Sequence, residues 1–227
     1  EQSTSLGLKG MPRLAEEVAL ARNLELLHYA GGRLHVTKVS TARSLELIRA
    51  AKRKGLHVTC DVTTYQALLD DSLLHDFDTN YKVNPPLREK PDQDAILKAL
   101  KDGTIDVLTT GHLPQDEESK MLEFDLADFG IINLQTAASH ISSLSKTVEL
   151  EELVDKLTDQ PRKILGIPLP TVAEDQKANL TLYAPHEAWT FTAADNYSKS
   201  KNSPWLGKEL IGRAVAVFNN GKQIIHE

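Results

Sequence analysis

The stretch from Gly103 to Gly130 holds the best single candidate for chemistry, because one histidine directly follows a short buried strand. Residues 105–109 are apolar or β-branched, a pattern typical of a strand in an α/β core. Gly111, His112 and Gln115 follow in a long polar loop. Because α/β proteins present functional groups at the carboxyl ends of their strands, His112 is a candidate for binding or proton transfer.

Other polar residues lie in or just after predicted strands, and each has a plainer alternative. His35 sits within an apolar strand, which favours a hydrogen-bonded core histidine over a ligand. Lys38 should face the opposite side of that strand, as a site cation or as a solvated strand end. Tyr65 and Gln66 either bind a polar ligand or cap a loop, and the loop is slightly favoured. The acidic run 116–118 is typical of a solvated loop.

Motifs and composition exclude several classes of function. The sequence has no His-x-His, no His-Glu-x-x-His and no cysteine pair for zinc, and it lacks a Gly-x-Ser-x-Gly elbow and a phosphate-binding glycine loop. Its formal charge of −6, with scattered Lys and Arg, predicts no nucleic-acid partner and no membrane partner. The lone Cys60 allows no intrachain disulfide, which favours a cytoplasmic setting.

The elements that must position these residues alternate between strand and helix. Residues 12–30 carry apolar side chains at helical spacing. Residues 33–39 and 56–63 are strand-like, and the helix between them can be capped by Ser40-Thr41 and ended by Gly55. Such a β-α-β unit favours parallel strands.

The remaining chain is predicted to change character near Pro170. Before it, residues 65–88 are irregular, and two prolines after Asn84 form an extended loop that could hold a side chain for binding. After it, short β-rich runs and Asn219-Asn220-Gly221 predict a hairpin into Lys222–His226. Further helices are expected around Ile96, at 132–144, at 148–157 and at 161–166.

These patterns predict an α/β domain at residues 1–168 and a small β subdomain at residues 169–227. A complete (β/α)₈ barrel takes ~250 residues, so a closed barrel does not fit into the first domain. From the residues alone, the chain is an acidic cytosolic α/β protein with a polar pocket at its strand ends.

Several segments resemble the dihydroorotases of the amidohydrolase superfamily. They include KVNPPLR at 82–88, LKDGTID at 100–106 and GRLHVTKVSTARSLELIRAAKRKGLHVTCDVT at 32–63, and the resemblance runs in order over nearly the whole chain. It implies the C-terminal part of a (β/α)₈ metal-dependent hydrolase barrel plus a β subdomain, with the earlier strands upstream of Glu1. It also implies pyrimidine biosynthesis, in which zinc-held hydroxide attacks the cyclic amide of dihydroorotate to give carbamoyl aspartate.

The chain departs from the family where the resemblance places metal and proton transfer. Lys38 and Tyr65 stand at the positions of two ligand histidines. Gly111 stands at the position of the aspartate that transfers protons, so no catalytic residue is assigned. Gln115 replaces a histidine that contacts substrate. Zinc, which the resemblance implies as cofactor, is therefore not expected to bind to this segment.

The resemblance also identifies candidate substrate contacts and two opposed functions. The candidates for substrate binding are Asn84, His112, Gln115, Phe129 and Gly130. The favoured hypothesis is a dihydroorotase homologue that has lost or impaired hydrolysis and acts as a scaffold, as a homo-oligomer or with aspartate carbamoyltransferase. The rival is an active dihydroorotase or related cyclic amidohydrolase with a rearranged metal site that uses His112, His35 or groups outside this sequence. A third alternative is a protein that binds a small ligand through Asn84 without turnover.

Overall fold

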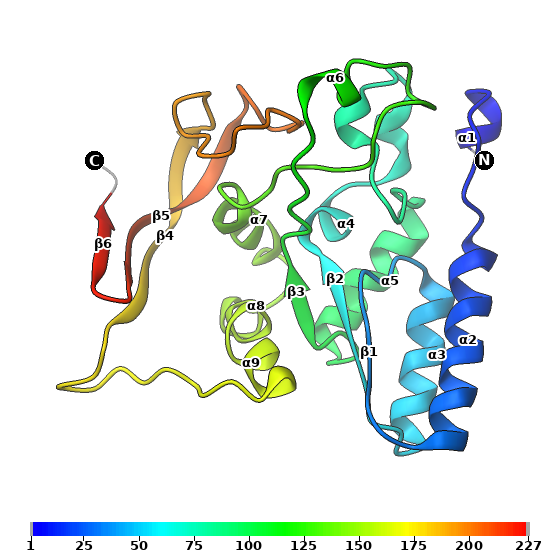
Figure 1. Cartoon of the computed structure of the whole chain (residues 1–227), viewed down its shortest axis with the longest axis horizontal. Coiled ribbons are helices and arrows are strands. Elements are labelled where there is room, and N and C mark those ends of the chain that lie inside the picture. Colours follow the sequence, from blue (N-terminus) through cyan, green and yellow to red (C-terminus); the bar gives the residue numbers. More distant parts are fainter. Residues whose placement is uncertain (1, 226–227) are drawn as a thin grey trace. The chain divides into compact units, whose positions relative to one another are not determined.

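The computed structural model describes residues 2–225 (Figure 1). Contacts divide the chain into two compact units, each of which is described by itself. The first unit runs to Asn133 and includes Ser198–Pro204, and the second contains Leu134–Tyr197 and the residues from Trp205 onward. The domains expected at 1–168 and 169–227 stay a prediction.

A three-stranded parallel sheet forms the centre of the first unit. Its strands lie in the order β1-β2-β3, with Leu34 opposite Val58 and Asp61 opposite Val107. The predicted β-α-β unit with parallel strands is therefore confirmed. The strands are β1 (Leu34–Val36), β2 (Val58–Thr63) and β3 (Val107–Thr109).

Three longer helices pack in the first unit, where α3 contacts α2, α5 and β2 (Figure 1). Helix α3 begins at a Thr41 cap, whose side chain accepts from the Ser44 amide at 3.1 Å, and it buries Leu45 and Ile48. Burying one such side chain stabilises the fold by about 1.5–3 kcal/mol. These helices are α2 (Arg13–Ala30), α3 (Ala42–Arg53) and α5 (Lys90–Lys101).

Short helices occupy segments of the first unit that were expected to be irregular. The expectation of an irregular chain from Tyr65 onward is wrong at its start, because the Thr63 side chain ends β2 and accepts from the Gln66 amide at 3.3 Å to begin α4. The acidic run 116–118 is exposed, as predicted, but it belongs to a short helix and its cap. The short elements are α1 (Gln2–Ser5), α4 (Thr64–Leu68), η1 (Asp71–Leu74), η2 (Thr79–Tyr81) and α6 (Glu117–Lys120).

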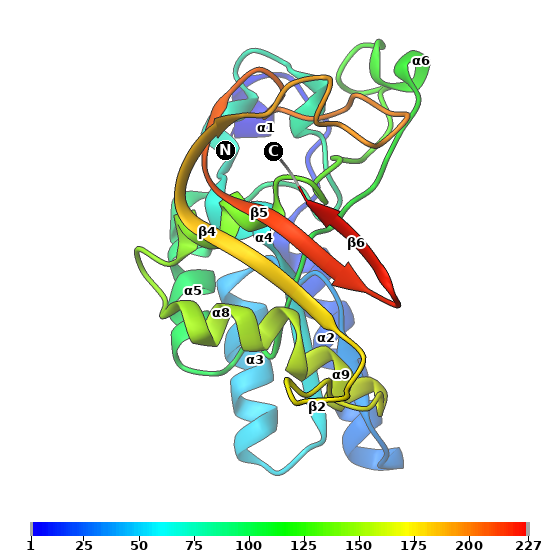
Figure 2. The same ribbon diagram turned by 90° about the vertical axis from the view of Figure 1, so that its left-hand side faces the viewer.

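The second unit combines helices with an antiparallel sheet of order β4-β5-β6 (Figure 2). The predicted hairpin is confirmed through Ile225, with Asn220 and Gly221 at φ 51° and 75°, while His226 lies outside the described residues. Buried His140 and Trp205 pack with ring centroids 4.4 Å apart. The elements are α7 (Ala137–Leu144), α8 (Leu150–Leu157), α9 (Asp159–Leu165), β4 (Asn179–Thr190), β5 (Glu209–Asn219) and β6 (Lys222–Ile225).

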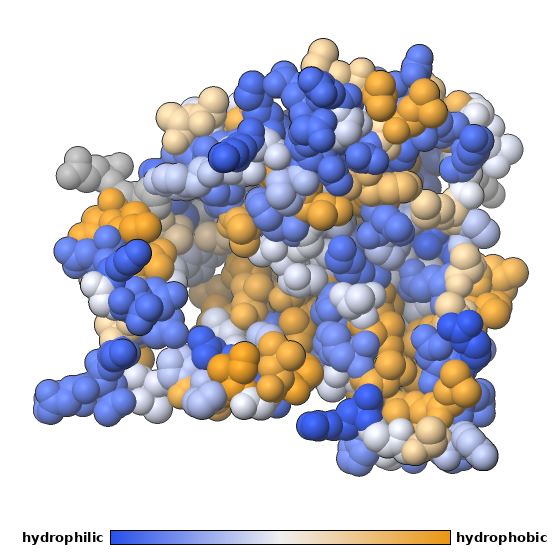
Figure 3. Space-filling model, in the orientation of Figure 1, coloured by the Kyte–Doolittle hydropathy of each residue, from blue (hydrophilic) through white to orange (hydrophobic). Residues whose placement is uncertain are grey.

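Apolar side chains are also found on the surface (Figure 3). On α2 the exposed fractions are 64% for Leu14 and 58% for Val18. Among the described residues, none of the helices has the length and apolar character needed to traverse a bilayer.

Candidate functional site

Lys38 lies beyond the end of β1, in a backbone conformation that side chains rarely adopt. Its φ is 56°, and its amide donates to the buried carboxylate of Asp61 at 2.8 Å. Because β1 ends at Val36, the strand alternation that predicts opposite faces for His35 and Lys38 does not reach Lys38. The hydrogen bond to Asp61 engages the backbone of Lys38. The only functional group on its side chain is the ammonium group.

His35 is an exposed residue, so the expectation of a core histidine is wrong. Strand β1 lies at an edge of the sheet, and His35 alternates outward between half-buried neighbours. Its Nδ1 lies 2.8 Å from Thr59 Oγ1, and its Nε2 lies 3.0 Å from Asp61 Oδ2. Asp61 thus joins His35 to the Lys38 backbone. The sequence could have indicated a role for Asp61, because an aspartate is unusual inside a strand of apolar and β-branched residues.

Tyr65 and Gly111 fit together at the ends of β2 and β3. Tyr65 is 2% exposed. A Cβ atom added to Gly111 would lie 2.6 Å from Tyr65 Cε1 and 2.7 Å from Thr63 Cγ2, distances that side-chain atoms do not tolerate. Gly111 also has a φ of 62°, which glycine adopts without strain. The tyrosine ring therefore fills the space in which the side chain of an aspartate at position 111 would begin.

These residues do not fit a zinc ion. Zinc binds through thiolate, imidazole and carboxylate groups, and the ammonium group of Lys38 has no lone pair to donate. Burial raises the pKa of the Tyr65 phenol, which keeps it neutral and protonated at pH 7. In the part of the chain that the structure describes, no three His, Cys, Asp or Glu side chains group in a way that could hold a metal.

His112 is held as a neutral imidazole in the polar loops next to these strand ends. It forms an isolated bridge with Ile131, and its Nδ1 accepts from the Asn133 amide at 2.9 Å. The proton of the neutral ring is therefore on Nε2. Burial lowers the pKa of His112, which favours this neutral form. The arrangement gives His112 an N–H group that can donate a hydrogen bond.

Gln115, Phe129 and Gly130 are joined by direct contacts. Gln115 Nε2 donates to the Phe129 carbonyl at 2.8 Å, and the Gly130 amide donates to the Lys82 carbonyl at 2.9 Å. A Cβ atom on Gly130 would lie 2.5 Å from the Leu113 carbonyl oxygen, so the two backbones can approach only because position 130 is glycine. The structure thus brings three of the predicted substrate contacts together.

Asn84 is connected to this region through the backbone on either side of it. Its side chain is exposed, and it precedes Pro85 in a cis peptide bond. Two residues earlier, Lys82 accepts from Gly130, and the buried Gln66 amide donates to the Pro85 and Pro86 carbonyls at 2.8 and 3.2 Å. Gln66 therefore anchors the proline loop from within helix α4.

Two asparagines that sequence reasoning missed organise the polar loops. Asn133 is 1% exposed and donates to Thr64 Oγ1 at 2.9 Å and to the Thr110 carbonyl at 2.6 Å. Asn202 donates to the Leu113 carbonyl at 3.0 Å and accepts from the Gln115 amide at 3.3 Å. Neither residue belongs to a recognisable local motif. Their partners are distant in sequence, which is why only the folded chain reveals them.

Solved structures with the same fold indicate the class of protein to which this fold belongs. The chain matches L-hydantoinase (dihydropyrimidinase) from Arthrobacter aurescens with a TM-score of 0.84 and 25% identity, covering 95% of this chain and 50% of that one. A D-hydantoinase from Bacillus sp. AR9 gives a TM-score of 0.81 at 25% identity, with the same coverage. The fold is therefore α/β and is that of part of an amidohydrolase barrel, as the resemblance implied.

Comparison with curated sequences then gives the homologues. The chain is 40% identical over 222 residues to a dihydroorotase of Trichlorobacter lovleyi, and 42% identical over 224 residues to one of Geobacter metallireducens. These matches cover 97% and 98% of this chain, but 52% and 53% of the relatives. The chain is thus a homologue of dihydroorotases and spans about half the length of the curated relatives it matches. No protein-family model matches it.

Proposed function

We propose that the chain is a dihydroorotase homologue that holds no catalytic zinc at its strand ends and serves as a scaffold. The observation that carries this proposal is the contact of Tyr65 with Gly111. A carboxylate side chain at position 111 and the buried ring at position 65 exclude each other, so the residues that replace the family's ligand and aspartate form one packed arrangement. Loss of a cooperating set of groups leaves little of its activity.

A solved structure supports the existence of such proteins in this fold. It is described as the inactive dihydroorotase-like domain of the Chaetomium thermophilum CAD-like multifunctional protein. The chain matches it with a TM-score of 0.66 and 24% identity, covering 90% of this chain and 54% of that one. At that identity the match concerns the fold alone. A scaffold of this kind would act as a homo-oligomer or would support aspartate carbamoyltransferase.

The experiment is a metal analysis paired with an assay on the full chain. Zinc content is measured by elemental analysis, and turnover is followed with dihydroorotate and with carbamoyl aspartate. The dihydroorotase of Geobacter metallireducens, treated in parallel, is the positive control. We expect substoichiometric zinc and no turnover from a sample whose folding is confirmed by circular dichroism. Stoichiometric zinc together with turnover would overturn the proposal.

The alternative function is an active cyclic amidohydrolase with a rearranged metal site. It is favoured by the names of the curated homologues and by the position of His112 beside the strand ends as a neutral ring. This alternative predicts zinc-dependent turnover that disappears in His112→Asn. In a scaffold the same substitution changes neither metal content nor turnover.

A further inference from the structure

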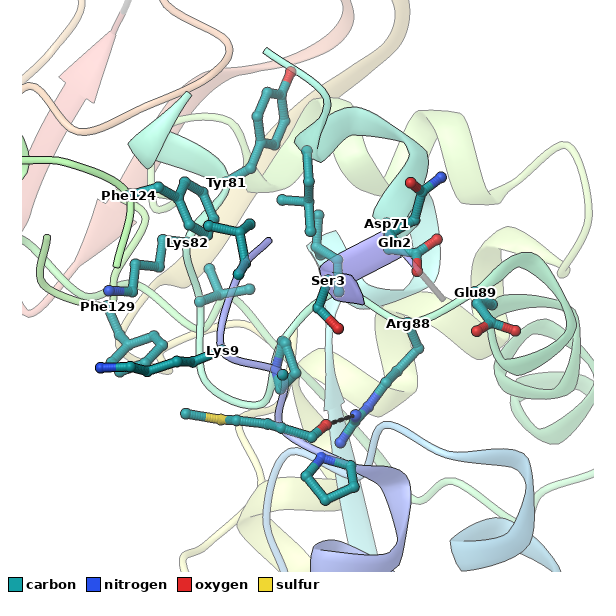
Figure 4. A pocket seen from close by; sticks show the side chains of 18 of the residues that line it. Gln2, Ser3, Lys9, Asp71, Tyr81, Lys82, Arg88, Glu89, Phe124 and Phe129 are labelled. Atoms are coloured by element: carbon teal, nitrogen blue, oxygen red, sulfur yellow. Dashed lines mark hydrogen bonds between the residues drawn. The ribbon is translucent and has the colours of Figure 1, made fainter. Parts of the chain in front are cut away.

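A cavity of about 760 Å³ lies wholly within the first unit (Figure 4). Its walls come from three segments of the chain, residues 8–13, 81–89 and 124–129, together with parts of α1 and η1. Its volume falls in the range of small-molecule sites, which are mostly apolar with a few polar groups. Lys38, Tyr65 and Gly111 are not among the residues that line it.

One end of the cavity combines an ammonium group with two aromatic rings. Lys82 Nζ lies 4.8 Å from the ring centroid of Phe129 and 5.8 Å from that of Phe124. It donates to the Asp125 carbonyl at 3.0 Å, and an ammonium group has three N–H donors. The whole residue is 9% exposed, and burial lowers the pKa of Lys82. An anion bound here would replace the hydration that this charge has lost.

A second lysine extends toward the same end. In Figure 4 the side chain of Lys9 runs toward the region of Lys82 and Phe129. Lys9 is exposed. The carboxylates of Asp125 and Asp128 interact electrostatically with Lys82 and favour its charged form, and Lys9 adds a second ammonium group. The two ammonium groups at this end can both donate to one carboxylate head group.

The remaining charges of the cavity are used by the fold or lie at the other end. Arg13 bonds to Glu89 at 2.9 Å and to Asp92 at 2.6 Å. Arg88 donates to Ser40 Oγ at 3.0 Å and to the Met11 carbonyl at 2.7 Å. Figure 4 shows Asp71 and Glu89 on the side away from Lys82.

Asp71 makes the far end of the cavity unfavourable for a second anion. Burial, with the neighbouring carboxylates of Glu89 and Asp70, raises the pKa of Asp71. A ligand with a negative charge at each end would add to this repulsion, whereas an uncharged end would not.

We propose that this cavity binds a small aromatic monocarboxylate, with its carboxylate between Lys82 and Lys9 and its ring against Phe124 and Phe129. Charge-assisted hydrogen bonds from ammonium to carboxylate supply recognition of the head group, and offset or edge-on ring contacts supply recognition of the body. The apolar walls include the buried side chains of Val83 and Leu87, against which the body of the ring can pack. The proposal does not depend on whether the chain hydrolyses a cyclic amide.

Isothermal calorimetry on the full chain tests this with three probes that share a phenyl ring. We expect 3-phenylpropionate to bind. Phenethylamine, with the opposite charge, and phenylsuccinate, with a second carboxylate, should each bind at least about tenfold more weakly. Equal binding of 3-phenylpropionate and phenethylamine would show that the cavity does not distinguish the sign of the ligand's charge, and this would overturn the proposal. No binding of 3-phenylpropionate would also overturn it.

Variants then locate the site. Lys82→Met should weaken 3-phenylpropionate binding at least about tenfold, but it also removes the bond to the Asp125 carbonyl. Lys9→Gln removes a charge from an exposed side chain and should weaken binding about threefold or more without changing the thermal unfolding midpoint. Lys98→Gln, an exposed change on α5 outside the cavity, is the control. If Lys9→Gln binds the probe as well as Lys98→Gln does, the site is wrongly placed.

Discussion

The strand ends of β1–β3 and the polar loops beside them are held together by different interactions. At the strand ends, Tyr65 and Gly111 are packed so closely that neither tolerates a larger neighbour. In the loops, Asn133 and Asn202 hold backbone groups by hydrogen bonds, and the Asn133 amide donates to the ring of His112. One region is a filled interior, and the other is a framework of polar groups.

The resemblance assigns these two regions to different parts of a dihydroorotase site. Tyr65 and Gly111, which the resemblance places at a metal ligand and at the proton-transfer group, pack against each other, whereas His112 and Gln115, which it places at substrate contacts, are held by hydrogen bonds. The five substitutions below test the contrast, beginning with the two whose expected effects are largest.

Gly111→Ala should destabilise the fold by about 2–4 kcal/mol. Overpacking against Tyr65 and Thr63 costs about 1–3 kcal/mol, and the positive φ of 62° adds about 1 kcal/mol. Gly103→Ala is the matched control, because its φ is 75° and an added Cβ meets no atom within 4 Å. Urea denaturation of both variants measures the difference, and equal losses would show that Tyr65 does not fill the site.

Tyr65→Ala, alone and combined with Gly111→Ala, tests whether these two residues interact directly. Alone it removes a buried ring and should cost about 3–5 kcal/mol. Combined with Gly111→Ala, the loss should be smaller than the sum of the two single losses by at least about 1 kcal/mol, because the clash has been removed. Additive losses would mean that the two residues do not interact.

Asn133→Ala should cost about 2–3 kcal/mol, because the carbonyl of Thr110 loses its donor in a buried environment. Asn133 links Thr64 and Thr110 at the strand ends to the loop of His112, so this change affects both regions. Asn23→Ala, on α2, is the control and should stay within about 0.5 kcal/mol of the unchanged chain. A loss no larger than that of Asn23→Ala would show that the link is dispensable.

His112 should make the stability of the folded chain decrease at acidic pH. Its pKa is lowered in the folded state, so its contribution to stability is fully present above its ordinary pKa near 6.5 and is lost as the pH falls toward the folded value. Protonation also removes the Nδ1 acceptor of the Asn133 amide. His112→Asn keeps an acceptor without titrating. Between pH 7.5 and pH 5, the free energy of unfolding of this variant should therefore fall less than that of the unchanged chain, and the difference should be about 1 kcal/mol or less.

Urea denaturation at each pH makes this comparison. His140 also favours the folded chain at higher pH, because burial lowers its pKa to about 3, but it titrates in both proteins and cancels in the difference. Parallel pH profiles for His112→Asn and the unchanged chain would contradict the assignment of a neutral His112.

Gln115→Ala should have the smallest effect, about 0.5–1 kcal/mol. It removes the half-buried bond to the Phe129 carbonyl and leaves that carbonyl accessible to water. Amide hydrogen exchange around Phe129 should rise while exchange in β2 stays unchanged. Faster exchange in β2 as well would show that the loops and the strand ends are not separate structural regions.

Local patterns predicted much of the fold. The β-α-β unit followed from alternating and helical periods, and the last hairpin followed from Asn220-Gly221, whose positive φ values match the turn that such pairs favour. Boundaries were less accurate. The strand expected from Ile105 begins at Val107, because the pairing with Asp61 sets its start.

The parts of the site that could not be predicted depend on contacts between distant residues. His35 was misplaced because the sequence does not say that β1 is an edge strand. The packing of Tyr65 against Gly111 joins positions that follow two different strands, and the bonds of Asn202 join residues that are 87 and 89 positions apart in the sequence. The resemblance singled out positions 65 and 111, but only the folded chain shows that the ring at 65 and a side chain at 111 would fill the same space.

The sheet of the second unit has a consequence for handling the protein. Its order makes β4 and β6 the edge strands, and the side chains of Ile224 and Ile225 on β6 are 58% and 60% exposed. Edge strands with exposed apolar side chains can pair with strands of other molecules. Concentrated solutions of the chain should therefore aggregate by adding strand to strand. Replacing Ile224 with lysine should raise the concentration at which turbidity begins.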